Sequence, residues 1–456
     1  MAIASGGKTL VPLKRLTSSM PISLGERQKR AIIFVTFAFA TLFCITVPRI
    51  GPLVVVSITT AICVYLLFQD KPRTGYFENI LFRPEMPFVF WAVIASLWSP
   101  SQSDAFLKAM FLLALVLQAI ILVKTFRLID ARDVEMAAYG LVVGVILAGI
   151  YVALEIDSRQ AITRFILTHL PELDRSVEKH AKMRDGMIVG LSGAHNTRVS
   201  AILCLFVCPA LLALQVYAKG FVKWIGWAVL AAILLVVFQH PRTHSQTSQM
   251  AIFVLAITLV LATLSVRLAR WAVGAMAACA VLFVIPASMA MYTAGLHEEK
   301  SLFRSARARV VIWNGFAEET LQRPIVGAGT HSSKYFRPEP SIVHKMQYNE
   351  VGLGFSARRH PHNMYLQIWY ELGIVGALTF ALLGYSLWSR IRELPRKVAI
   401  LVTGHFAVCT TIIAPSYGLW QNWFQAAFVV SIMTLIFVAT PAIRDAINET
   451  GALPES

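Results

Sequence analysis

Charged residues are scarce in this sequence of 456 residues: Asp, Glu, Lys and Arg make up 14%, whereas hydrophobic residues make up 57%. Together with a mean hydropathy of +0.63, this composition excludes an ordinary soluble globular protein. Apolar runs recur along the chain instead, and each is close to the roughly 20 residues that cross a bilayer as a helix. The sequence therefore predicts an all-α polytopic membrane protein with about twelve transmembrane helices.

Acidic residues are the scarcer charge class, with 25 Asp and Glu against 41 Lys and Arg and a net charge of +16. Most of the basic excess falls in short loops at one set of helix ends, which the positive-inside rule places in the cytoplasm together with both termini. The short outer loops contribute only Arg49 and Arg242. Topology thus explains most of the charge without a nucleic-acid partner, and an anionic substrate such as a diphosphate would explain the basic residues of the long outer loops.

Cysteine is rare as well, and all 6 cysteines lie inside apolar runs. This placement excludes an extracytoplasmic disulfide framework, and no spacing of Cys and His suits a structural zinc. A Walker-type phosphate-binding motif is also missing from the sequence, so nothing points to a nucleotide as energy source. The first thirty residues are basic but lack an apolar run with a small-residue cleavage site, so we expect a cytoplasmic tail rather than a removed signal peptide.

Two long outer loops interrupt an otherwise even series of apolar runs. The predicted spans are Ala31–Val47, Gly51–Phe68, Met86–Trp98, Ala105–Val123, Val134–Leu154, Thr197–Tyr217, Phe221–Phe238, Gln249–Val266, Arg270–Tyr292, His362–Trp388, Val398–Ala414 and Leu419–Thr440. The predicted organisation is a cytoplasmic tail (1–30), nine transmembrane helices with an outer loop near 155–186 (31–292), a large periplasmic loop (293–361), three further helices (362–440) and a second cytoplasmic tail (441–456).

The large outer loop carries its own helical pattern. Residues Arg309–Glu319 have amphipathic spacing, and Pro324 is expected to end that helix. Gly327 and Gly329 then predict a tight turn. Loops of this length are uncommon without a function, so we expect specific chemistry here.

A polar cluster at the start of the tenth predicted span is the strongest site signal, because polar groups at membrane depth are costly unless they are partnered or functional. It contains His360, His362 and Asn363. A neutral imidazole at this position can take a proton from a hydroxyl group. The alternative is that His362 and Asn363 only cap the helix.

Several other residues are candidates to bind a substrate at the same outer face. Arg242, Arg309 and Arg198 offer guanidinium groups for phosphate oxygens, although each also suits an interfacial or solvated position. Trp313 can stack on a sugar ring, but it also suits an aromatic belt at the membrane surface. Glu371 can orient His362 or make a buried structural hydrogen bond.

One ordered series of residues resembles the O-antigen ligase and polymerase superfamily of bacterial envelope glycosyltransferases. It consists of Arg309-x-x-x-Trp313, then Pro324-Ile325-Val326-Gly327-Ala328-Gly329, then His360-Pro361-His362-Asn363-x-Tyr365-Leu366-Gln367-x-x-x-Glu371-Leu372-Gly373-x-x-Gly376. The identity covers roughly Arg304–Phe380. Around Arg242 the sequence Pro241-Arg242-Thr243-His244-Ser245 departs from the Ser-Arg that family members often show, so Arg198 competes for the phosphate role.

The resemblance implies a GT-C-like membrane enzyme with its active site facing the periplasm across the bacterial inner membrane. The donor would be a glycan on undecaprenyl diphosphate, and the acceptor would be the lipid A-core in a ligase or another lipid-linked glycan in a polymerase. No nucleotide sugar, metal or other cofactor would take part. His362 would be the catalytic base and Arg242 and Arg309 would hold the diphosphate, while His360, Asn363, Arg198, Trp313, Tyr365, Gln367 and Glu371 would help to bind substrate.

Three functions remain open on these grounds: the ligase, the polymerase and a multi-span transporter. A transporter is expected to carry paired ionisable residues near the middle of broken helices. In this sequence the interiors of most predicted spans are apolar and the polar groups collect at the outer face. The pattern therefore favours a glycosyltransferase, with the ligase first and the polymerase second.

Overall fold

The computed structural model describes residues 25–69, 82–170, 181–184, 187–191, 193–240, 245–336 and 360–450. In this part the chain is almost entirely helical, which confirms the predicted all-α membrane fold. The helices that coincide with predicted spans are α2 (Glu26–Thr46), α3 (Gly51–Gln69), α4 (Met86–Ala95), α5 (Gln102–Phe126), α6 (Ala131–Asp157), α8 (Ala194–Tyr217), α9 (Gly220–Gln239), α10 (Gln246–Leu264), α11 (Val266–Leu282) with α12 (Val284–Thr293), α15 (Met364–Arg390), α16 (Arg396–Ile413) and α17 (Asn422–Thr450).

Within the described residues, 9 helices are long and apolar enough to cross a bilayer, and the bent pair of α11 and α12 raises the number to 10. Two shorter apolar helices, Gly51–Val64 and Met86–Trp98, cover the other predicted spans. The span predicted as one helix over Arg270–Tyr292 is broken at Phe283, where the axis bends by 71°. The total of about twelve spans stays a prediction.

The two long outer loops contain structure of their own. The first holds α7 (Ala161–His169) and an antiparallel hairpin of β1 (Ala181–Arg184) and β2 (Met187–Leu191). The second holds α13 (Arg304–Gln322), a helix as the amphipathic spacing predicts, and η6 (Ser332–Tyr335). Two further 3-10 turns are η3 (Ser96–Trp98) and η8 (Ile391–Glu393).

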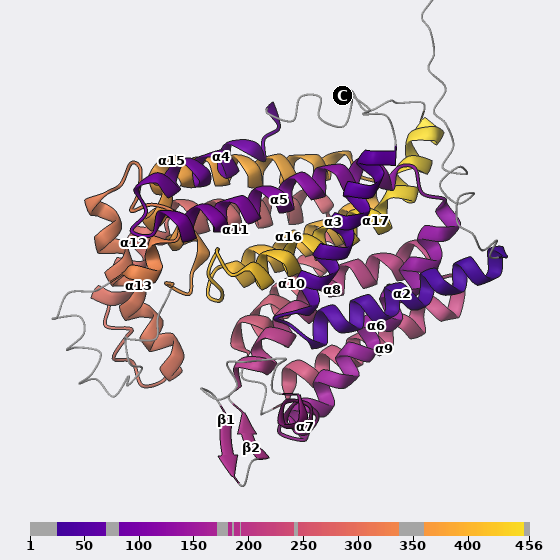
Figure 1. Ribbon diagram of the computed structural model, residues 1–456, viewed down its shortest axis with the longest axis horizontal. Helices are drawn as coiled ribbons and strands as arrows, with labels where there is room; N and C mark the ends of the chain where they lie inside the picture. Colours follow the sequence, from indigo (N-terminus) through magenta and orange to yellow (C-terminus); the bar gives the residue numbers. More distant parts are fainter. Residues whose placement is uncertain are drawn as a thin grey trace, which may run out of the picture.

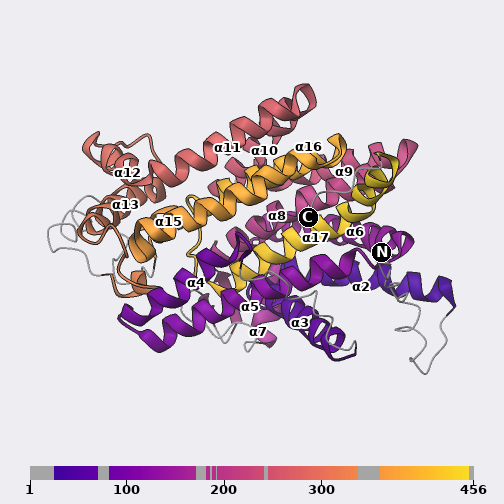
Figure 2. The same ribbon diagram turned by 90° about the horizontal axis from the view of Figure 1, so that it is seen from above.

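Helix α8 forms the centre of the bundle. It packs against α6, α16 and α17, and 89% of its most apolar stretch is buried inside the protein. By contrast, α9 and α10 leave most of their apolar side chains on the outside, as expected for helices that face lipid. Figures 1 and 2 show α12 and α13 together at one end of the bundle, beside the start of α15. The large loop therefore covers the end at which the His-Pro-His segment lies.

Candidate active site at the start of helix α15

The break in α15 connects this helix to the glycine turn of the large loop. Gly373 interrupts the helix with φ 63° and ψ −163°. The carbonyl groups of Tyr370 and Glu371 accept the N–H groups of Ala328 (2.9 Å) and Gly329 (2.8 Å) in place of a partner within the helix. In the other direction, the Ile374 N–H donates to the Pro324 carbonyl at 2.8 Å. The Pro324–Gly329 motif thus docks onto the exposed backbone of α15.

A buried carboxylate closes the same junction. Glu371 is fully buried and accepts hydrogen bonds from the backbone N–H groups of His331 (3.0 Å) and Ser333 (3.1 Å). Its other donors are the Gln367 amide at 3.0 Å and the Trp420 indole. A buried carboxylate with four donors is well satisfied. Of the two interpretations of Glu371, the geometry supports the structural hydrogen bond.

Gln367 and Tyr365 face the protein interior as well, with 1% and 3% of their surface exposed. The side-chain oxygen Oε1 of Gln367 accepts the Leu419 N–H at 2.8 Å, and the Tyr365 hydroxyl donates to the Thr410 backbone carbonyl at 3.3 Å. We therefore revise the substrate-binding role predicted for Tyr365, Gln367 and Glu371 to a supporting one. Gln367 and Glu371 fix the loop 414–421 against the start of α15, and Tyr365 joins this helix to α16.

His362 lies directly before this helix and reaches that loop. Its Nδ1 atom lies 3.0 Å from the carbonyl oxygen of Ser416. A carbonyl can only accept, so Nδ1 carries the proton of the neutral ring and the basic lone pair is on Nε2. The backbone of His362 is in the left-handed region, with φ 55°. Such strained conformations in non-glycine residues concentrate at functional sites.

Asn363 is the N-cap of α15, and its side chain accepts the Leu366 N–H at 3.1 Å. The capping interpretation is therefore correct for Asn363, whereas the His362 ring is engaged with Ser416. Helix α13 also holds the His360–Asn363 segment, because the Trp313 indole donates to the Pro361 carbonyl at 2.9 Å. Trp313 thus positions the residue before His362.

His360 contacts both the backbone of His362 and the loop between α16 and α17. Its Nδ1 accepts the His362 N–H at 3.2 Å, and its Nε2 lies 3.0 Å from the side-chain amide nitrogen of Gln421. Burial, together with the nearby His362 ring, lowers the pKa of His360 to about 3. Because its ring stays neutral near pH 7, His360 suits a positioning role better than proton transfer.

Two predicted arginines converge on the residue after Ser416. Burial raises the pKa of the Tyr417 hydroxyl, and the charges of Arg198 and Arg309 oppose that rise, which places both guanidinium groups near this side chain. Burial in turn lowers the pKa of Arg309. The Tyr417 hydroxyl is buried without a hydrogen-bond partner among the described residues. Arg198 on α8 and Arg309 on α13 thus lie near Tyr417, and His362 contacts Ser416 beside it.

Arg242 lies outside the described residues, so its predicted role stays a prediction. Sequence reasoning missed three residues of the loop between α16 and α17, namely Ser416, Tyr417 and Gln421. Their only sequence signal is a short polar interruption between two apolar runs, which by itself is typical of any loop. Their roles follow from contacts with segments far away in the chain.

Comparison with known proteins identifies the same segment. Residues 241–381 match the family model described as O-antigen ligase. A protein of Rickettsia conorii named "Putative polysaccharide ligase" is 31% identical over 140 residues, which cover 30% of this chain and 33% of the relative. Similarly named proteins of Rickettsia felis and Rickettsia prowazekii are each 30% identical, over 140 and 142 residues, and these matches again cover 30% of this chain and 34% of each relative.

The match thus spans about a third of the length of these relatives. The family segment includes Arg309, Trp313, the glycine turn and His362, whereas Arg198 and Tyr417 lie outside it. With its bundle of apolar helices, this is an integral membrane protein. Residues 241–381 of this chain are thus similar to the O-antigen ligase family.

Proposed function

We propose that this protein is an O-antigen ligase-type glycosyltransferase. It takes a preassembled glycan from undecaprenyl diphosphate and transfers it to a hydroxyl group of the lipid A-core. The family segment supports the class of reaction. The Lys and Arg bias of the short loops supports an inner-membrane protein whose termini are cytoplasmic and whose His362 end faces the periplasm.

In the proposed mechanism His362 is the general base. Its Nε2 takes the proton of the acceptor hydroxyl while the hydroxyl oxygen attacks the anomeric carbon of the donor glycan. The bond between that carbon and the diphosphate breaks, and the diphosphate leaves with the electron pair. General base catalysis by a positioned group contributes about 10²–10⁴-fold to the rate. The Ser416 carbonyl holds the tautomer that leaves Nε2 basic.

The leaving diphosphate develops negative charge, which cations beside it stabilise. Arg309 and Arg198 are the described candidates because both lie near Tyr417, one residue after Ser416. Arg242, in the short loop after the seventh predicted span, is a third candidate. The convergence of His362 and two arginines on Ser416–Tyr417 is the observation that carries this proposal. No metal takes part in the proposed mechanism.

The test compares lipopolysaccharide and lipid-linked glycans from a deletion strain of the source bacterium, complemented with wild type or His362→Ala. A ligase predicts that the strain lacks glycan on the lipid A-core and accumulates long chains on the lipid carrier. Wild type should reverse both effects, and His362→Ala should reverse neither while reaching the membrane at a normal level. Full transfer by His362→Ala would contradict the base assignment.

Other outcomes of the same experiment identify the alternatives. Cores that still carry a single repeat unit in the deletion strain indicate a polymerase, because chain extension is then the missing step. Unchanged core glycans and lipid-linked chains contradict both transferases and favour the transporter. In a matched Asn363→Ser variant another good N-cap residue replaces the amide, so full transfer by this variant would show that Asn363 is needed only as a cap.

A further inference from the structure

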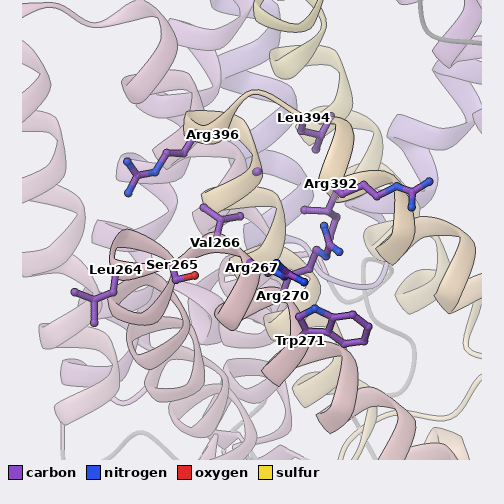
Figure 3. Close-up of a pocket in the computed structure, with 11 residues that line it drawn as sticks. Leu264, Ser265, Val266, Arg267, Arg270, Trp271, Arg392, Leu394 and Arg396 are labelled. Carbon is purple, nitrogen blue, oxygen red and sulfur yellow. The ribbon is translucent and has the colours of Figure 1, made fainter.

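A second polar site lies at the opposite end of α15 from His362. This helix has 27 residues, and a straight helix of that number of residues is about 40 Å long. A cavity of about 740 Å³ opens there, between the turn that joins α10 to α11 and the turn that joins α15 to α16 (Figure 3). A cavity of this size falls in the range of small-molecule sites, roughly 300–1,000 Å³. The proposed active site does not use it.

Four arginines line this cavity and no lining residue is acidic: the arginines are Arg267, Arg270, Arg392 and Arg396. Among the described residues, Glu393 is the one carboxylate paired with any of them, at 3.5 Å from Arg392 with both side chains exposed. The Arg270 guanidinium stacks on Trp388, 5.0 Å from the ring centroid, and its buried Nε has no hydrogen-bond partner in the described part of the chain. Within the described residues, the positive charge of this cavity is therefore largely uncompensated.

The backbone adds further hydrogen-bond donors. Helix α11 begins at this cavity, and Ser265 caps it by accepting the Leu268 N–H at 3.2 Å. The start of a helix of this length is favourable for an anion. Arg396 is held in place by its hydrogen bond to the Thr263 carbonyl at 2.8 Å. Planar guanidinium groups around a helix start suit phosphate oxygens better than a single point charge would.

Apolar side chains flank the cavity on the outer surface of the bundle. Leu264, Leu268 and Trp271 are 75%, 55% and 55% exposed. Exposed leucines beside an interfacial tryptophan indicate contact with acyl chains next to the headgroup layer. The positive-inside bias puts this end of the helices in the cytoplasmic leaflet, where anionic lipids attract basic residues.

We propose that this cavity binds the phosphate headgroup of an anionic phospholipid in the cytoplasmic leaflet. The arginines hold the phosphate, while the acyl chains lie along Leu264, Leu268 and Trp271. A soluble phosphate would need the charge but not the exposed apolar flank, which is why we assign the site to a lipid. This site is independent of the proposed glycan transfer.

The test uses the full-length protein in nanodiscs of phosphatidylcholine with a minor fraction of phosphatidylglycerol. Native mass spectrometry counts the lipids that stay bound when the disc is removed. We expect wild type to retain phosphatidylglycerol selectively. Arg267→Gln/Arg270→Gln should lower that selectivity roughly thirtyfold, because each basic residue near an anionic surface contributes about fivefold to the binding of an anionic lipid. The matched control is Arg127→Gln/Arg132→Gln, which removes two charges at the same end of the bundle but outside the cavity.

Equal retention by wild type and the double variant would overturn the proposal, as would an equal loss in the control. Arg392→Gln provides a second variant, at an exposed side chain, and it should weaken selectivity about fivefold. If inorganic phosphate in the buffer displaces the bound lipid, the cavity binds a soluble anion, and the proposal that a phospholipid occupies it is wrong. Lipid retention is measured without transfer, so this result does not depend on the proposed reaction.

Discussion

Gly327 and Gly373 face each other, backbone against backbone, and both have positive φ angles of 72° and 63°. A Cβ atom on Gly327 would lie 2.6 Å from the Gly373 nitrogen, and one on Gly373 would lie 2.8 Å from the Gly327 nitrogen. No side chain fits at such distances. This contact lets the turn of the large loop reach the break in α15, and so fixes the loop that carries His331 and Ser333 to Glu371.

Gly373→Ala should therefore destabilise the protein, although Gly→Ala in a helix normally stabilises it. We expect a loss on the order of 3 kcal/mol from the unfavourable φ angle and the clash with backbone. The matched control is Gly384→Ala in the same helix, where a Cβ meets nothing within 4 Å. Thermal unfolding of the detergent-purified variants measures both. A melting temperature for Gly373→Ala at or above that of Gly384→Ala would contradict this account.

Most of the helices are predictable from sequence because an apolar run of spanning length usually determines one element by itself, although the run over Arg270–Tyr292 forms two. The amphipathic run at Arg309–Glu319 likewise predicts α13, which extends over Arg304–Gln322. The polar cluster at His360–Asn363 was found because ionisable groups stand out next to an apolar helix. These signals are local, so a single sequence contains them.

The breaks and the contacts between distant segments were not predictable in the same way. A glycine inside an apolar run usually stays helical, so Gly373 gave no sign that the helix opens there. Ser416 and Tyr417 became part of the site only because α16 and α17 bring their loop to His362. The large-loop motif forms the predicted tight turn, but the sequence does not show that the N–H groups of Ala328 and Gly329 bond to the carbonyls of Tyr370 and Glu371.

Trp313→Phe tests the positioning of the His-Pro-His segment. The change keeps an aromatic ring on α13 but removes the N–H that donates to the Pro361 carbonyl. Small displacements of a catalytic group cost up to about 10²-fold in rate, so we expect kcat for transfer to fall by roughly tenfold or more with KM little changed. Trp224→Phe, on the exposed face of α9, is the control and should have no effect. An unchanged kcat for Trp313→Phe would contradict the positioning role.

The low pKa of His360 makes a prediction about stability. Burial and His362 lower this pKa to about 3, whereas the unfolded chain would take up a proton near pH 6.5. Between these values the unfolded state binds more protons, so the stability contributed by a neutral His360 is complete above about pH 6.5 and is lost as the pH falls towards 3. His360→Gln cannot titrate and should flatten this dependence.

Melting temperatures of the purified protein between pH 4.5 and 8 measure the effect. His169→Gln, at the exposed end of α7, is the control and should keep the wild-type dependence. If His360→Gln loses stability on acidification as steeply as wild type, buried His360 is not the responsible group.

Arg309→Lys tests whether a planar guanidinium is needed beside Tyr417. Lysine keeps the charge but presents a single ammonium group, so it cannot hold two phosphate oxygens in the same way. We expect kcat/KM for transfer to fall about tenfold or more if Arg309 holds the leaving diphosphate. Arg304→Lys lies at the exposed start of the same helix and should transfer at the wild-type rate. Equal rates in the two variants would remove Arg309 from the phosphate site.

Tyr417→Phe separates a role in the reaction from a role in the fold. The Tyr417 hydroxyl is buried without a hydrogen-bond partner in the described part of the chain, so its removal should leave the melting temperature unchanged or raise it. If a diphosphate binds between Arg198 and Arg309, however, this hydroxyl is placed to donate to a phosphate oxygen, and its loss should lower kcat/KM roughly tenfold.

Tyr385→Phe, an exposed tyrosine on α15, is the matched control for the loss of a hydroxyl. A stable Tyr417→Phe with weakened transfer would tie the residue after Ser416 to the donor phosphates, and so connect the base and the leaving-group site through one short loop. A stable variant with full transfer would show that the two arginines act without it. In that case the phosphate position moves away from this loop, towards the segment that contains Arg242.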